Sequence, residues 1–374
     1  MILVAKVFIR DKIVFTKKRG PGILVFFCLM RVLAVLVAVF VSSALISCKP
    51  NSGSSESEGI TITFSGATMG TTYHIKAYLN QSLGLEKEAL HQIIDDDLVN
   101  FNQIMSTYIA DSELSLLNRA PAHQWIALSP PLWEVLSISR EVAKYSEGAF
   151  DPTVGPLVNV WGFGPNKRIS FPSEEEIEAA KALTGFKRLS FDDESRRVMK
   201  LGELYLDLSA IAKGYATDVL GDLLEAYAIK NYMVEIGGEL KIRGVNGTGG
   251  YWTIGVERPS LAHDGAMLAI SGDNVGIATS GDYRNYYEED GIRASHTIDP
   301  NTGKPITHSL ASITVIAESA AMSDAYATAI NVMGPDFGFE FAETHHMAAY
   351  FIVREGGVFK EKYTSEFRSY IVEG

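Results

Sequence analysis

The fold is decided by the stretch LDLSAIAKGYA at residues 206–216. Alternating side chains over residues 205–208 predict a strand, and the apolar spacing of residues 211–226 predicts a helix directly after it. A second strand is predicted over residues 232–236. The N-terminus of the helix therefore follows the end of a strand, where unpaired backbone N–H groups favour anions.

Outward from this stretch, helices and short strands are interspersed, which predicts an α+β fold with substantial antiparallel sheet. Apolar residues spaced by three and four predict a helix over residues 85–105, and Ser129 followed by two prolines predicts the start of another. Near the C-terminus a helix is predicted over residues 320–333, with Gly334 as its cap. Short strands are predicted over 239–243, 252–257, 267–270, 275–279, 348–353 and 369–372.

The charge of the chain excludes one class of partner. The 374 residues include 33 basic and 45 acidic side chains, a formal net charge of −12. Seven of these basic residues and one acidic residue lie in the first 47 positions, so 26 and 44 remain beyond them, a net charge of −18. A body this acidic repels nucleic acid, because phosphate binding requires clustered Lys and Arg.

The N-terminal segment has the composition of an export signal. Arg31 precedes an unbroken apolar run over residues 32–41, and small or apolar residues then lead into Cys48. This order resembles the bacterial lipobox, in which the cysteine is lipidated and becomes the mature N-terminus. Residues 1–47 are therefore predicted to be a signal peptide, and a start at Met30 would leave the preceding residues untranslated. A signal anchor that spans the bilayer is the alternative.

The segment after Cys48 predicts where the protein works. Residues 48–59 are rich in Ser, Gly and Glu and predict a flexible tether, followed by a functional domain over residues 60–374. Lipid chains on Cys48 would hold this domain at a membrane of the bacterial cell envelope, facing the periplasm or another extracytoplasmic side. The only other cysteine, Cys28, lies in the signal segment, so the domain contains no thiol.

Two helices carry candidate site residues. Lys213 lies in the first turn of the helix at 211–226, where its charge would help a phosphate to bind, and Asp207 could position it. Asp324 and Thr328 are four residues apart and share a helix face, so a carboxylate and a hydroxyl, which are oxygen ligands that Mg²⁺ prefers, converge there. The alternatives are that Asp207 caps a turn, Lys213 points to water and Thr328 bonds to its own helix.

Two loops carry further candidates. Residues 148–156 form a Gly- and Pro-rich loop, and an aromatic side chain there could pack on a planar ring. The dense polar stretch over residues 295–303 includes His296, a candidate for proton transfer. Ordinary turn chemistry in the first loop and a surface histidine in the second are the alternatives.

Taken in order, eight segments make the chain resemble the ApbE family of FAD:protein FMN transferases. The match extends from about Gly66 to Gly334, most of the domain. The segments are GATMGTTY at 66–73, MSTY at 105–108, GAFDPTVG at 148–155, LDLSAIAKG at 206–214, EIGGE at 235–239, TSGDYR at 279–284, SHTIDP at 295–300 and SDAYAT at 323–328.

This resemblance implies a two-part α+β structure of the T-fold type with FAD held between the parts, and it assigns roles. The residues expected to line the FAD site are Met69, Tyr108, Ala149, Phe150, Asp151, Asp207, Lys213 and Ile298. Asp324, Thr328 and the main-chain carbonyl of Ala210 are expected to bind Mg²⁺. His296 falls in the segment where the family is thought to have a catalytic histidine, and Lys213 is expected to support catalysis.

The resemblance also implies a reaction. A threonine of an acceptor protein would attack the FMN-side phosphorus of FAD, which is a substrate here, and AMP would leave. One alternative is hydrolysis of FAD to FMN and AMP by the same site. A second alternative is a non-enzymatic flavin-binding lipoprotein, which would need no metal.

Overall fold

The computed structural model describes residues 59–80, 84–164, 168, 170–259, 265–281, 286–289 and 292–372. All of them belong to one compact unit, Ser57–Gly374. The predicted signal peptide, Cys48, most of the tether, and residues 282–285 of the predicted TSGDYR segment lie outside the described residues. Among the described helices, none is long and apolar enough to cross a membrane.

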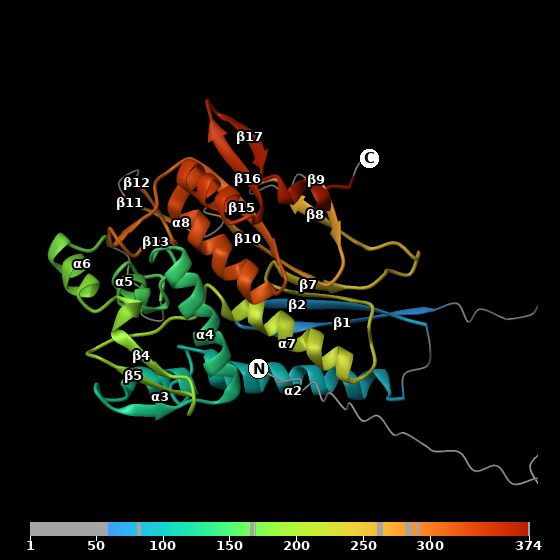
Figure 1. The fold of residues 1–374 in the computed structure, drawn as a ribbon, viewed down its shortest axis with the longest axis horizontal. Coiled ribbons are helices and arrows are strands. Elements are labelled where there is room, and N and C mark those ends of the chain that lie inside the picture. The colour runs from blue at the N-terminus through green and yellow to red at the C-terminus, as the bar shows by residue number, and fades with distance from the viewer. Residues whose placement is uncertain are drawn as a thin grey trace, which may run out of the picture. The chain divides into compact units, whose positions relative to one another are not determined.

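An eight-stranded sheet forms the centre of the fold, with strand order β1-β2-β6-β7-β10-β15-β16-β17 and every neighbouring pair antiparallel (Figure 1). Its strands are β1 Ile60–Thr68, β2 Thr71–Leu79, β6 Tyr232–Ile236, β7 Glu239–Arg243, β10 Val275–Gly281, β15 Leu310–Ala317, β16 Ala348–Glu355 and β17 Val358–Tyr363. Within the described residues there are four smaller sheets. They consist of β3 Trp125–Ala127 with β5 Arg197–Lys200 and β4 Leu189–Asp192; β8 Trp252–Glu257 with β9 Ala266–Gly272; β11 Tyr286–Glu289 with β12 Ile292–Ser295; and β13 Ile298–Asp299 with β14 Lys304–Pro305.

The described helices are α2 Lys87–Met105, α3 Glu113–Arg119, α4 Pro130–Tyr145, α5 Gly155–Val160, α6 Glu174–Lys181, α7 Ala212–Ala226 and α8 Ala320–Thr344, with short 3₁₀ turns at Pro152–Val154, Phe186–Arg188 and Glu366–Tyr370. Of these, α2, α7 and α8 pack against the large sheet. In Figure 1, α7 and α8 lie against each other and along the sheet. Gly214 makes this close approach possible, because a Cβ atom there would lie 2.2 Å from the carbonyl oxygen of Ala320.

The large sheet is buried on both faces, as strand β16 shows. Ala349, Phe351 and Val353 face the core beneath the helices, whereas Ala348, Tyr350 and Ile352 face a second core that β8 and β9 help to cover. Side chains of a strand alternate between the two faces of its sheet. Burial of both faces therefore explains why this stretch is continuously apolar instead of alternating with polar residues.

The predicted α+β class is confirmed, and so are most predicted elements. Strands β6, β7 and β8 have the predicted bounds, and α7 begins one residue later than predicted. The helix predicted over 320–333 forms and ends at Gly334 as predicted, because Gly334 has a non-helical φ of 80°; a second helical segment, which carries the same label α8, then begins at Pro335 and continues to Thr344.

Two predicted strands are wrong. Residues 205–208 form no strand, because the Asn118 side chain takes both main-chain groups of Leu206: the Leu206 N–H donates to Asn118 Oδ1 at 2.7 Å, and Asn118 Nδ2 donates to the Leu206 carbonyl at 2.9 Å. In the predicted strand over 369–372, the first two residues belong to a 3₁₀ turn, and the other two form only an isolated bridge, between Ile371 and Ile270. Local side-chain bonds and turns thus replace sheet pairing at both places.

Candidate functional site

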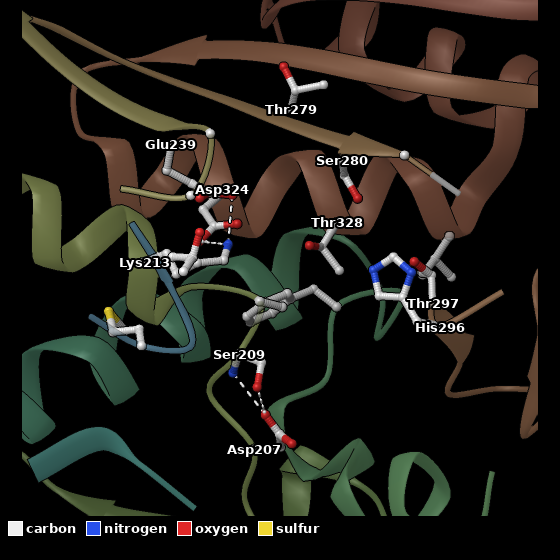
Figure 2. A pocket seen from close by; sticks show the side chains of 18 of the residues that line it. Asp207, Ser209, Lys213, Glu239, Thr279, Ser280, His296, Thr297, Asp324 and Thr328 are labelled. Carbon is white, nitrogen blue, oxygen red and sulfur yellow. Dashed lines mark hydrogen bonds and ion pairs between the residues drawn. The ribbon is translucent and has the colours of Figure 1, made fainter. Parts of the chain in front are cut away.

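A cavity of about 1280 Å³ opens between the helical segments and the large sheet. One wall comes from Tyr108 and the loop 149–154, and the other comes from strands β7 to β10 and from α8. In Figure 2, polar side chains from α7, α8, β7, β10 and the loop after β12 converge on the same space. The volume is large for a small-molecule site and suits an extended ligand.

The most strongly charged part of the cavity lies at the N-terminus of α7. Lys213 Nζ is 2.7 Å from Glu239 Oε1 and 3.9 Å from Asp324 Oδ2. Asp324 Oδ2 also accepts a hydrogen bond from the Gly214 N–H at 3.1 Å. Helix α8 is therefore connected to the first turn of α7 through one carboxylate, and β7 is connected to the same lysine.

Burial changes the titration of all three groups. It raises the pKa of Glu239 to about 7, although the Lys213 charge opposes the rise. Burial also raises the pKa of Asp324, again against Lys213. For Lys213, burial alone would lower the pKa, but the charges of Asp324 and Glu239 outweigh it and raise the pKa. When both carboxylates are ionised, the cluster carries one uncompensated negative charge, which a buried site tolerates poorly.

The cluster fits a hard cation. Glu239 Oε2 is buried and has no hydrogen-bond partner within the described chain. Asp324 and Thr328 lie one helical turn apart on α8, and Ala210 precedes α7; all three line the cavity. One carboxylate, one hydroxyl and one carbonyl suit Mg²⁺, because this ion usually keeps several water ligands. Among the described residues, there is no group of three or more His, Cys, Asp or Glu side chains that could hold a metal ion.

The residues predicted to line a flavin site all line the cavity: Met69, Tyr108, Ala149, Phe150, Asp151, Asp207, Lys213 and Ile298. Tyr108 is 66% exposed, so its ring is available at the mouth of the cavity. Phe150 is nearly fully buried and can offer a ligand little more than the edge of its ring. The structure thus brings together side chains from both ends of the domain.

Two of these residues use their carboxylates locally. Asp151 accepts from Thr153 N at 2.7 Å, from Thr153 Oγ1 at 2.6 Å and from Phe186 N at 3.1 Å, while burial raises its pKa. Asp207 Oδ1 accepts from Ser209 N at 2.8 Å and from Ser209 Oγ at 2.5 Å. Both residues therefore stabilise loops of the cavity. Asp207 caps a turn, which is the alternative role that the sequence allowed for it.

His296 lines the cavity beside two hydroxyls, those of Ser280 and Thr297. Its ring meets Phe163 edge-on, with centroids 6.4 Å apart and an interplanar angle of 71°. In Figure 2 the ring lies on the same side of the cavity as Thr328. An imidazole ring is thus located across the cavity from the charged cluster.

Comparison with known proteins places the chain in a family. A model of the ApbE family matches residues 69–351. The chain belongs to the ApbE family. Within this family, the FAD:protein FMN transferase of Vibrio cholerae serotype O1 is 42% identical over 308 residues, covering 82% of this chain and 92% of the relative. The FAD:protein FMN transferase of Haemophilus influenzae is 39% identical over 344 residues, covering 90% and 97%.

Solved structures of ApbE proteins share the fold. The flavin transferase ApbE from Vibrio cholerae superposes with a TM-score of 0.77 at 41% identity, covering 83% of this chain and 99% of that protein. The apo form of the Pseudomonas stutzeri flavinyl transferase ApbE also has a TM-score of 0.77, at 40% identity, covering 84% and 98%.

Within this ApbE-family site, the residues alone gave no role to Glu239, Ser280 or Thr297. Glu239 follows two glycines at the start of a strand and is 5% exposed. The strand sequence ELKIR gave no signal, because it also contains Lys241 and Arg243. Only the burial of Glu239 shows that its carboxylate requires a cation or hydrogen-bond donors.

Proposed function

We propose that this protein transfers FMN from FAD to a threonine of an acceptor protein and releases AMP. The observation that carries the proposal is the pairing, in one cavity, of a partly buried Lys213 and hard oxygen ligands with an exposed aromatic side chain. Lys213 and the oxygen ligands suit a diphosphate, and a planar ring can pack on the exposed aromatic side chain. Membership of a family whose named relatives are FAD:protein FMN transferases supports it.

The reaction balances without an oxidant or reductant. The acceptor threonine oxygen forms a bond to the FMN-side phosphorus, and the bond from that phosphorus to the oxygen of AMP breaks. The threonine proton goes to His296, a base that lines the cavity. Lys213, held between Glu239 and Asp324, offsets negative charge that builds up on the phosphoryl oxygens and on AMP.

Asp324, Thr328 and the carbonyl of Ala210 would hold Mg²⁺. When bound there, the ion would polarise the phosphoryl oxygens. The chain's own contribution is to fix these oxygens: the Gly214 N–H holds Asp324, and the first turn of α7 follows directly from Ala210.

The test combines FAD, Mg²⁺ and a candidate acceptor protein, followed by mass spectrometry of the acceptor and assay of AMP. We expect one FMN on a threonine for each AMP released, and no product from Asp324→Ala. Free FMN without labelled acceptor would indicate hydrolysis instead. FAD binding that is unchanged in Asp324→Ala, with neither product formed by the natural chain, would indicate a flavin-binding protein without enzymatic activity.

The site of action is part of the same proposal. The apolar run and the cysteine that follows it support cleavage before Cys48, lipidation of that residue and attachment to a membrane of the cell envelope. We expect metabolically supplied palmitate to label the natural chain and not Cys48→Ala. The labelled protein should fractionate with membranes and become accessible to protease once the outer barrier is opened.

A further inference from the structure

A polar stripe extends along α8 beyond the two predicted metal ligands. Asp324, Thr328 and Asn331 are spaced by four and three residues, so they share one helix face. Asn331 is fully buried and lies behind the wall of the cavity, whereas the first two line it. A fully buried amide in an otherwise apolar helix requires hydrogen-bond partners.

The amide of Asn331 binds two hydroxyls of the cavity wall. Asn331 Nδ2 is 3.2 Å from Ser280 Oγ and 3.4 Å from Thr297 Oγ1, and Asn331 Oδ1 is buried without a partner in the described chain. Turning the amide over would satisfy the oxygen and leave two N–H groups buried without acceptors. Since one unsatisfied carbonyl costs less than two unsatisfied N–H groups, nitrogen faces the hydroxyls.

The position of Asn331 along the helix is itself fixed. His308 Nδ1 accepts from the Leu310 N–H at 3.3 Å, so the ring proton lies on Nε2, which donates to the Asn331 carbonyl at 2.6 Å. His308 packs against Gly334, where the helix is interrupted. The turn that carries Asn331 is therefore held from outside the cavity.

We propose that Asn331 positions Ser280 and Thr297 as a pair of donors that bind phosphoryl oxygens of FAD beside His296. Each hydroxyl accepts one N–H from Asn331, so its own hydrogen points elsewhere. Neither hydroxyl donates to another group among the described residues. Both line the cavity, and Figure 2 shows them on the side where His296 and Thr328 lie.

The substrate class follows from charge and rests on the proposed function. Two neutral donors facing Lys213 across a cavity suit an anionic oxygen, because hydrogen bonds to charged acceptors are the stronger ones. The neighbouring Thr279 hydroxyl is different: it bonds Thr314 Oγ1 at 2.8 Å and is thereby engaged within the sheet. The pair is thus restricted to Ser280 and Thr297.

The experiment measures FAD binding to the full domain with Mg²⁺ by quenching of flavin fluorescence, without an acceptor. We expect Ser280→Ala combined with Thr297→Val to weaken binding roughly tenfold or more, the size expected for lost hydrogen bonds to a charged group. Asn331→Leu should weaken binding similarly. In the background that lacks both hydroxyls, Asn331→Leu should add less than about twofold, because it acts through them.

Three further variants complete the test. Thr297→Ser keeps the hydroxyl and should bind FAD within about twofold of the natural chain. Ser139→Ala removes a buried hydroxyl of α4 that does not line the cavity and should change nothing. If Asn331→Leu fails to fold, the hydroxyl variants alone decide, since they leave α8 intact.

Some outcomes would overturn the inference. Normal FAD binding by the variant without both hydroxyls would do so, and so would a full additional loss from Asn331→Leu in that background. Transfer of FMN is assayed in parallel. A natural chain that binds FAD through these hydroxyls and labels no acceptor refutes the proposed function and supports the donor pair, whereas absence of FAD binding refutes both.

Discussion

At the scale of single residues, Glu239 is the group whose removal has the clearest electrostatic consequence. Glu239→Gln keeps the shape of the side chain and removes one of two negative charges around Lys213. The cluster with Asp324 then becomes neutral, so we expect the apparent affinity for Mg²⁺ to fall roughly tenfold, a change equivalent to about 1.4 kcal/mol. Calorimetric titration of Mg²⁺ in the presence of FAD measures this affinity. Glu235→Gln, on the neighbouring strand β6 and outside the ion pairs of Lys213, serves as a control. An unchanged affinity would contradict this role.

His296 allows a second prediction at this scale. It lines the cavity beside hydroxyls and has no part in the charged cluster. We expect His296→Ala to lower kcat about 10²- to 10⁴-fold, the usual contribution of a general base, while the dissociation constant of FAD changes little. Rapid-quench measurement of acceptor labelling and flavin fluorescence separate the two quantities. Loss of binding with the rate of transfer preserved would refute proton transfer by this residue.

At the scale of elements, the crossing of α7 and α8 determines whether the charged cluster can assemble. A Cβ atom on Gly214 would lie 2.2 Å from the Ala320 oxygen and 2.8 Å from Asp324 Cβ. We expect Gly214→Ala to destabilise the fold by about 1–3 kcal/mol through overpacking and to weaken metal binding as the helices separate. Gly250→Ala, at an exposed turn with space around it, is the matched control. Denaturant unfolding measures the free energy of unfolding of both variants. Equal values for Gly214→Ala and Gly250→Ala would be inconsistent with a tight crossing of α7 and α8.

The start of α8 gives a pH-dependent prediction. Asp218 accepts from the Ala320 and Ala321 N–H groups at 2.9 Å, and burial raises its pKa from 3.8 to about 6 despite these bonds and the Lys241 charge. A raised pKa in the folded state contributes stability that is present below about pH 4 and is lost as the pH rises through 6.

We therefore expect the free energy of unfolding of the natural chain, relative to Asp218→Asn, to fall by on the order of 2 kcal/mol between pH 4 and pH 7. Comparison with the variant removes the other titrating groups, because they are common to both proteins. Urea unfolding at several pH values measures the difference. A difference that grows with rising pH would show that the N–H groups, and not burial, dominate this carboxylate.

At the scale of the whole molecule, much of the architecture could be predicted locally. Periodicity located α7 and the strands β6 to β8 within a residue, because their apolar spacing is regular. Strand β15 was not predicted, although it is buried on both faces and its sequence does not alternate, as in the predicted strand β16. The strand predicted over 205–208 does not form, because the side chain of Asn118 binds the main chain of Leu206. Asn118 lies far earlier in the chain, so the local sequence pattern contains no sign of this contact.

The candidate site followed a similar division. Resemblance to the family predicted Met69 and Asp207 as flavin-site residues and Asp324 as a metal ligand, and in the structure all three line one cavity. Glu239 and Asn331 had no assigned role, because their importance lies in what surrounds them: a lysine from α7 for the first and two hydroxyls from other segments for the second. Contacts between distant segments carry no local signature.

The two-sided construction of the cavity has a consequence for biosynthesis. Its walls come from residues as early as Met69 and as late as Val332. A chain that has only partly emerged, from the ribosome or across a membrane, has no complete ligand site until α8 has emerged. A dinucleotide therefore cannot act as a template for the early folding of this protein, and it can stabilise only the nearly finished product.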